Sequence, residues 1–210
     1  QAVVGDGRLQ PKVIRLARPS ESSIAQLLSP TSSGFSHPEV GATARPAELD
    51  RLASRYTIDR RRFALAPGRA VFERAGVALL AWRHFEIPWL ELHGATVPAF
   101  AGQQVATLTR FLGLWFVNPC RVVYVEAPSQ DPDGVAFAYG TLPGHVAQGE
   151  ERFSVRHDPA TGGNTFEIVA FSRPAILLAR LGRPLLRRTQ KRFAPDVARA
   201  LEAACRSGSC

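Results

Sequence analysis

The pattern of hydrophobic and polar residues divides the chain into a helical part, a strand-rich part and a second helical part. After Pro67-Gly68, apolar residues recur at spacings of three and four, which predicts an amphipathic helix that Pro88 ends. Its apolar stripe consists of Val71, Ala75, Ala78, Leu79 and Trp82. Two shorter helices are expected before it, one capped by Ser20 and one over residues 46–55.

Between residues 89 and 172 the pattern changes to short segments that are rich in Val, Phe, Tyr and Thr. Turn-forming residues separate these segments, and we take Asn118-Pro119 and Pro143-Gly144 as two of the turns. The predicted strands cover residues 56–65, 89–97, 103–111, 121–127, 134–141, 150–157 and 164–171. Consecutive strands with short connections favour an antiparallel meander.

The last part of the chain is predicted to be helical again. Pro174 opens it, Gly182-Arg183-Pro184 interrupts it, and a kink is expected at Pro195. The apolar stripe consists of Leu186, Phe193, Val197, Leu201 and Ala204. A sheet needs a cover for its apolar face, and this helix can supply it. The expected fold is therefore α+β, with a curved antiparallel β-sheet of about six or seven strands gripping a long C-terminal helix.

A chain of 210 residues fits one domain, which we place at residues 20–205 between an extended lead-in (1–19) and a short tail (206–210). Its three cysteines are odd in number and form no C-x-x-C pair, so neither a zinc site nor a disulfide framework is expected. A reducing cytoplasm is the simplest expectation. The chain begins at Gln1 without Met, which leaves open a targeting segment before it. No apolar run reaches the roughly 18 residues of a membrane span.

The net charge of +8 is concentrated in one segment. Residues 173–192 hold seven of the 26 basic residues and no acid, which leaves 19 basic residues against 18 acidic ones elsewhere. Such a segment is either a solvated helix face or a contact for an anionic membrane or nucleic acid. Nucleic acid is not expected as a partner, because Phe193 belongs to the buried stripe. Peripheral contact with a membrane stays open.

The richest stretch for chemistry runs from Tyr139 to Phe153. Strand alternation places Glu151 on the apolar face with Phe153, whereas Glu150 should face water. Tyr139 ends the apolar face of the preceding strand, and His145 lies in the connection between the two strands. We therefore expect Tyr139, His145 and Glu151 to converge at one end of the sheet, where they could bind a polar group or move a proton.

A structural explanation of the same residues stays open beside the functional one. Gly140, Gly144 and Gly149 could simply shape a long hairpin connection, with His145 and Glu151 satisfying its backbone. Farther along, Gln190 is a polar residue on the apolar stripe of the last helix. It would either make a helix-to-sheet hydrogen bond or touch a ligand.

Several separate motifs occur in an order that resembles the DUF1990 family, also called UPF0548. They include PEVGAT at 38–43, YGTLPGH at 139–145, AFSRP at 170–174 and PLLRRTQ at 184–190. The resemblance covers residues from about 22 to 204, with His37 where a tyrosine would be expected. The family has no assigned activity, so it implies no catalytic residues. The strand-then-helix pattern is also similar, more distantly, to helix-grip folds of the Bet v 1 type, which include START/SRPBCC-type domains.

These observations favour a domain without metal or cofactor that binds a small, largely apolar or amphipathic molecule between the sheet and the C-terminal helix. The residues expected at the polar end of that ligand are Tyr139, His145, Glu151, Arg173 and Gln190. One alternative is a hydrolase, cyclase or isomerase in which Glu151 or His145 acts as base and Tyr139 as acid or oxyanion donor. Another is an interaction module that docks through residues 173–192. The oligomeric state stays open.

Overall fold

The computed structural model describes residues 14–29, 34–175 and 183–207, and for residues 183–191 it describes the backbone alone. Its centre is an antiparallel sheet of eight strands in the order β2-β8-β7-β6-β5-β4-β3, with β1 paired to β5. The strands are β1 (Ile14–Arg15), β2 (Thr57–Leu65), β3 (Leu90–His93), β4 (Gln104–Phe111), β5 (Leu114–Glu126), β6 (Gly134–Thr141), β7 (Ala147–His157) and β8 (Asn164–Pro174). The predicted meander is confirmed from β3 to β8.

One predicted turn is wrong, because β5 runs straight through Asn118-Pro119. The chain turns earlier, at Leu112-Gly113, where both residues have positive φ angles of 48° and 78°. Proline is tolerated in this strand because residue 119 lies between the stretch that pairs with β1 and the stretch that pairs with β6. Its missing N–H therefore removes no rung of the ladder.

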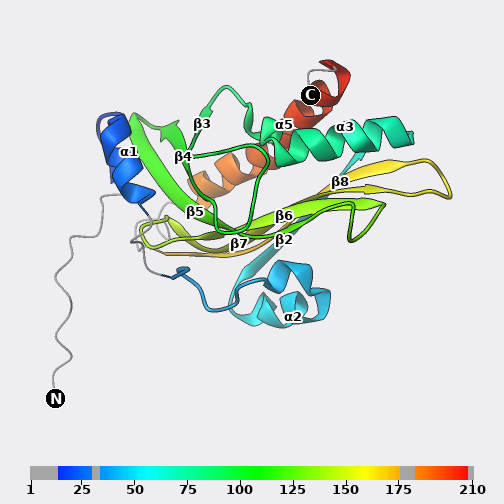
Figure 1. Cartoon of the computed structure of the whole chain (residues 1–210). Helices are drawn as coiled ribbons and strands as arrows, with labels where there is room; N and C mark the ends of the chain where they lie inside the picture. Colours follow the sequence, from blue (N-terminus) through cyan, green and yellow to red (C-terminus); the bar gives the residue numbers. More distant parts are fainter. Residues whose placement is uncertain (1–13, 30–33, 176–182, 208–210) are drawn as a thin grey trace.

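Short helices cover the outer face of the sheet. The predicted Ser20 cap is confirmed, since its hydroxyl accepts a hydrogen bond from the Ser23 amide at the start of α1 (Glu21–Leu27). Ile24 of α1 packs on the outer side of β4 and β5. The turn η1 (Ala42–Ala44), helix α2 (Pro46–Arg51) and turn η2 (Leu52–Ser54) cover the outer side of β8. Figure 1 shows α2 below the sheet, opposite α3 and α5.

Helix α3 (Arg69–Leu80) ends eight residues before Pro88, where the sequence pattern placed its end. The helix ends because Trp82 adopts a left-handed conformation with φ 61°, and the turn η3 (Arg83–Phe85) follows. The expected stripe is largely correct, although Phe72 is buried where Val71 is only partly so. Gly76 lets α3 approach the sheet, since a Cβ there would lie 3.0 Å from a methyl group of Val135.

The C-terminal helix α5 (Arg183–Ser207) lies beside α3 on the same face of the sheet, as Figure 1 shows. Val197, Leu201 and Ala204 are buried, as predicted, and Pro195 lies within the helix. The expected opening at Pro174 is wrong, because this residue ends β8. Gly182 and the side chains of Leu186 and Gln190 lie outside the described part of the chain. None of the described helices is both long and apolar enough to cross a bilayer.

Aromatic side chains fill the middle of the space between the sheet and the two helices. Phe137, Phe153 and Phe166 from the sheet are fully buried there against Trp82 and Phe85. Ring centroids 4.6 to 6.1 Å apart link Phe137, Phe153, Trp82 and Phe85 to Tyr139 at the edge of the cluster. Such rings supply a large share of the apolar area that stabilises a core.

Candidate functional site

The centre of the candidate site is a hydrogen bond between Tyr139 on β6 and Glu151 on β7. The two residues are directly paired across the strands, and the phenol donates to Oε2 of Glu151 at 2.6 Å. Both face α3 and α5, next to the ring of Phe153, whose centroid lies 5.5 Å from that of Tyr139. The structure thus places this acid on the apolar face, where strand alternation predicted it.

Burial sets the protonation of this pair. Removal from water raises the pKa of Glu151 to about 7, although the hydrogen bond from Tyr139 acts in the opposite direction. Asp59 raises it further, because it lies in the same row across the sheet, with Ala170 between the two acids. Burial also holds the pKa of Tyr139 well above its usual range. A carboxyl group with this pKa exchanges its proton readily near neutral pH.

His145 lies in the connection between β6 and β7 and makes a local hydrogen bond. Its Nδ1 accepts from the Ala147 amide at 2.9 Å, so the neutral ring carries its proton on Nε2. Burial lowers the pKa of His145 to about 4. Among the described residues, neither a hydrogen bond nor an ion pair joins His145 to Tyr139 or Glu151. The structure therefore gives His145 a role in shaping the turn and does not couple it to the pair.

Arg173 is not brought to the pair either. Its guanidinium lies over the ring of Tyr56, 4.9 Å from the centroid, and donates to Gln148. The reason is that β8 extends to Pro174, so alternation turns Arg173 to the outer face along with Phe171. The side chain of Gln190 lies outside the described residues, and its expected ligand contact stays a prediction.

Glu150 is buried, and the prediction that it faces water is wrong. It is 2% exposed, because the segment around η1 covers it. Its carboxylate accepts the backbone amides of Gly41 at 2.6 Å and Thr43 at 3.0 Å, and also the hydroxyl of Thr43. Burial raises its pKa, and these hydrogen bonds oppose the shift. The acid thus anchors the PEVGAT motif to the sheet, a contact between residues more than 100 positions apart that strand alternation cannot reveal.

The ring of His37 packs beside this anchor. It lies edge-on to Phe171 at 5.3 Å, with Nε2 4.0 Å from Oε2 of Glu150. Burial lowers the pKa of His37 to about 4, so the ring is neutral at ordinary pH. Gly140 beneath it leaves the necessary room, since a Cβ there would lie 2.9 Å from the imidazole. Packing therefore explains Gly140.

A second buried histidine occupies the aromatic core. His84 is fully buried, with its ring 4.8 Å from Phe153 and 4.4 Å from Phe85. Neither of its ring nitrogens, nor the indole nitrogen of Trp82, has a hydrogen-bond partner among the described residues. Burial lowers the pKa of His84 to about 3. No group of metal-binding side chains occurs in the described ranges.

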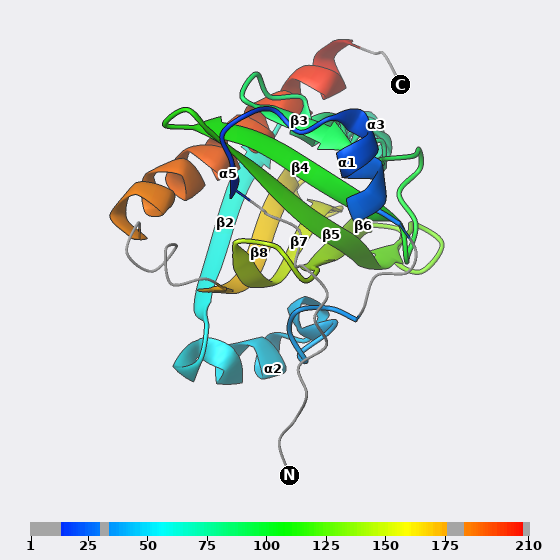
Figure 2. The ribbon, with the colours of Figure 1, turned by 90° about the vertical axis from the view of Figure 1, so that its left-hand side faces the viewer.

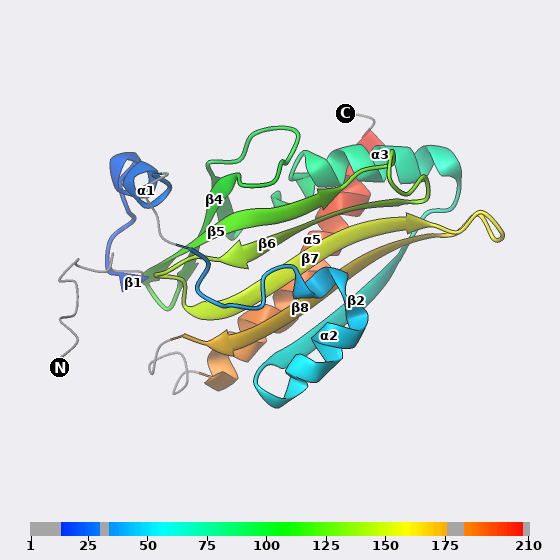
Figure 3. The ribbon, with the colours of Figure 1, turned by 60° about the horizontal axis from the view of Figure 1, so that its bottom comes forward.

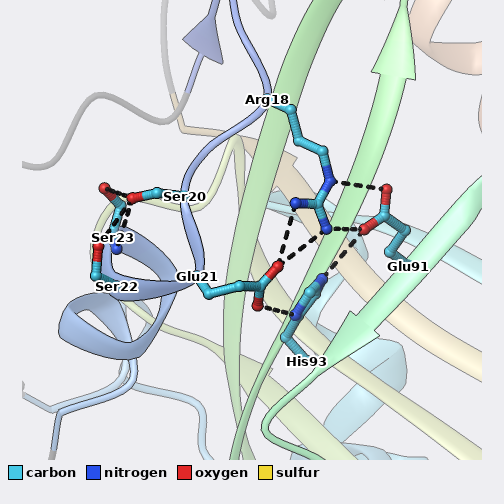
Figure 4. Close-up of polar contacts among 7 residues, drawn as sticks. All are labelled: Arg18, Ser20, Glu21, Ser22, Ser23, Glu91 and His93. Atoms are coloured by element: carbon cyan, nitrogen blue, oxygen red, sulfur yellow. Dashed lines mark hydrogen bonds and ion pairs between the residues drawn. The ribbon is translucent and has the colours of Figure 1, made fainter.

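A charged network on the surface joins the N-terminal segment to the edge of the sheet. In Figure 4 the guanidinium of Arg18 lies between the carboxylates of Glu21 and Glu91, and His93 contacts both acids. The contact of Arg18 with Glu91 is 2.5 Å long. Exposed ion pairs of this kind contribute little to stability, so the network fastens α1 to β3 without forming a catalytic arrangement.

A surface cleft of about 290 Å³ lies at the other end of β7 and β8, around Arg62 and Arg156. Its arginines are paired with acids, since Arg62 contacts Glu167 at 2.6 Å and Arg156 contacts Asp131 at 2.9 Å. The cleft is therefore a weaker candidate than the Tyr139–Glu151 pair.

Comparison with known proteins places the chain in a family. Residues 36–200 match the model of DUF1990, a domain of unknown function. The chain belongs to the DUF1990 family. A UPF0548 protein of Arabidopsis thaliana is 32% identical over 188 residues, which cover 84% of this chain and 90% of that protein. A UPF0548 protein of Dictyostelium discoideum is 31% identical over 163 residues, covering 74% and 76%.

Solved structures show that this DUF1990 domain has the helix-grip fold expected from the sequence. Protein jhp0584 from Helicobacter pylori superposes with a TM-score of 0.52 at 11% identity, covering 83% of this chain and 98% of that one. The Zhui aromatase/cyclase from Streptomyces sp. R1128 superposes with a TM-score of 0.51 at 14% identity, covering 72% and 94%. At these identities the likeness concerns the fold alone.

Proposed function

We propose that the DUF1990 domain binds a small, largely apolar molecule whose polar group pairs with Glu151 and Tyr139, at the end of the space between the sheet and α5. The observation that carries the proposal is a carboxyl–phenol pair on the apolar face of the sheet, where a carboxyl group contributes nothing to apolar packing. An acid on an apolar, partly desolvated face destabilises the fold, and groups with such perturbed pKa values gather at functional positions.

The carboxylate has capacity for a ligand. Tyr139 occupies Oε2 of Glu151, and Oε1 accepts no hydrogen bond from any described residue. Glu151 is partly exposed, so a hydroxyl or amine can reach it from the end of the sheet. With a pKa of about 7, the group can accept such a hydrogen bond when ionised or donate one when protonated.

Aromatic residues next to the pair would contact the apolar part of the ligand. Phe85 lies 6.1 Å from Tyr139 and 5.9 Å from Phe193 of α5, between ring centroids. The packed rings farther inside favour a small ligand held at the end of this space. The Zhui aromatase/cyclase has the same fold, so by analogy this fold can carry a site for a small molecule.

Titration with β-naphthol, a fluorescent aromatic molecule with one hydroxyl group, tests this proposal. The variant Tyr139→Phe/Glu151→Leu removes both polar groups and keeps their apolar volume. We expect it to bind at least about tenfold more weakly than the wild type, because a hydrogen bond to a charged group contributes about 1.5–3 kcal/mol. Glu73→Gln, on the exposed side of α3, is the matched control and should bind as the wild type does. Equal affinity for all three proteins would refute the proposal.

The same geometry supports proton transfer as a second candidate function. A carboxyl group with a pKa of about 7 beside a phenol can act as base towards a bound molecule. The two functions differ in the fate of the ligand, because an enzyme returns a changed molecule and a binding domain returns the same one. Mass spectrometry of the released ligand after incubation separates them.

Docking through residues 173–192 has less support, since the described Arg173 and Arg192 lie over Tyr56 and Trp89.

A further inference from the structure

The tip of the β4–β5 hairpin exposes large apolar side chains. The sequence Phe111–Phe116 (FLGLWF) forms the tip, and Leu112 at its turn is 74% exposed. β1 pairs with β5 at Trp115 and Phe116, which brings the following residue, Leu16, to the same place with 87% of its surface exposed. Single exposed leucines are ordinary, but two adjoining a run of aromatic residues form a patch.

The backbone at the tip makes the leucine more unusual. Phe111 and Leu114 pair directly, so Leu112-Gly113 is a two-residue hairpin loop with both φ angles positive, at 48° and 78°. Such loops strongly favour Asn, Asp or Gly at the first position, because a larger side chain is strained there. Leu112 thus contradicts the residue preference of its turn and also belongs to an exposed apolar patch. A residue that does both without a gain in packing indicates a function.

Basic residues flank the apolar tip. The strand register places Arg15, Trp115 and Arg110 in one row, with the tryptophan between the two arginines. The guanidinium of Arg110 lies 6.0 Å from the centre of the Trp115 ring. Exposed leucines, an interfacial tryptophan and nearby arginines are the combination by which proteins attach to the surface of anionic bilayers. The net charge of +8 also attracts the protein to an anionic bilayer.

We propose that this tip, formed by residues 14–16 and 110–116, docks on an anionic lipid bilayer, with Leu112 inserted into the interface. The tip lies at the end of the sheet that also holds the β6–β7 connection, because β5 pairs with Thr141 at Cys120. Figures 2 and 3 show β1 beside β5, and Figure 3 shows the end of β8 and the start of α5 at that same end. The docking does not depend on the proposed ligand. If both hold, the candidate site would face the membrane.

Vesicle sedimentation tests the docking with a variant that should not harm the fold. Leu112→Asn places a favoured residue in the turn, so it should raise the midpoint of thermal unfolding. The same change should weaken binding to phosphatidylcholine/phosphatidylserine vesicles by about tenfold or more, given the free energy of burying one leucine side chain. The matched control is Val97→Ser, since Val97 is 70% exposed and lies before β4, away from the tip. This control should bind as the wild type does.

Three results would overturn the proposal. The first is a wild-type protein that stays in solution with the mixed vesicles, or binds pure phosphatidylcholine equally well. The second is equal binding by the Leu112→Asn variant, or an equal loss in the Val97→Ser control. The third concerns a different occupant. If light scattering shows a wild-type dimer that Leu112→Asn converts to a monomer, the tip is a contact between copies of the chain.

Discussion

Replacing Glu151 by Gln should change how the stability of the protein depends on pH. Gln keeps the shape of the side chain and an oxygen that accepts the hydrogen bond from Tyr139, but it cannot ionise. The wild-type carboxyl group has a pKa raised from 4.5 to about 7 by burial. The folded protein therefore binds a proton at Glu151 over a pH range in which the unfolded chain has already released it.

The sign and the size of the effect follow from this difference. Between pH 4.5 and about 7 the folded state holds more protons than the unfolded state, so the contribution of Glu151 to stability falls as the pH rises. Below this range the contribution is fully present, and above it the loss is complete. A pKa raised from 4.5 to about 7 corresponds to a loss of about 3 kcal/mol.

The assay is urea unfolding of both proteins at several pH values, followed by tryptophan fluorescence. The quantity to compare is the free energy of unfolding of the wild type minus that of Glu151→Gln, because other groups with shifted pKa values, such as His37, contribute equally to both proteins. This difference should fall by about 3 kcal/mol across the range. In Asp59→Asn the upper end of the range should move to lower pH, since Asp59 raises the pKa of Glu151. A difference that stays constant with pH would refute the reasoning.

Three further predictions concern stability. Glu150→Ala should lower the free energy of unfolding by about 2–4 kcal/mol in urea titrations, because it leaves buried amide groups unsatisfied; a loss below 1 kcal/mol, within the range of a surface change, would contradict the anchoring role. Gly140→Ala should cost about 1–3 kcal/mol in the same assay, since its Cβ would lie 2.8 Å from the ring of Phe35; an unchanged midpoint would mean that the space is not restricted. Tyr139→Phe/Glu151→Leu should unfold at or above the wild-type temperature in calorimetry, because both polar partners are removed together; a fall of more than about 8 °C, beyond 2 kcal/mol for a domain of this size, would assign the pair a structural role.

Local chemistry predicted much of the fold. Ser20 caps its helix because the hydroxyl satisfies a free amide within three residues, a relation that the sequence displays directly. The strands from β3 to β8 follow from turn residues and β-branched runs in the same way. The errors occur where contacts with other parts of the chain determine the local structure. Asn118-Pro119 has the composition of a turn, yet neighbouring strands hold it extended, and α3 ends at Leu80, just before the left-handed Trp82 and eight residues before Pro88.

The candidate site was predictable to the same extent. The period of two along β7 correctly separated Glu151 from Glu150 and placed Glu151 on the apolar face, where the structure pairs it with Tyr139. This period cannot show what covers each face of the sheet. It therefore predicted that Glu150 faces water, although the PEVGAT motif buries this residue. Arg173 was misplaced because no turn or strand pattern in the sequence shows that β8 continues to Pro174.

The most direct test of the central proposal is to analyse the small molecules that the protein carries. The wild type, Glu73→Gln and Tyr139→Phe/Glu151→Leu would be purified from the protein's own host under mild conditions, and native mass spectrometry would compare them with their organic extracts. We predict one small, largely apolar molecule with a polar group in the first two proteins and its loss from the double variant. Equal recovery from all three proteins, or recovery from none, would contradict a ligand site at Tyr139 and Glu151.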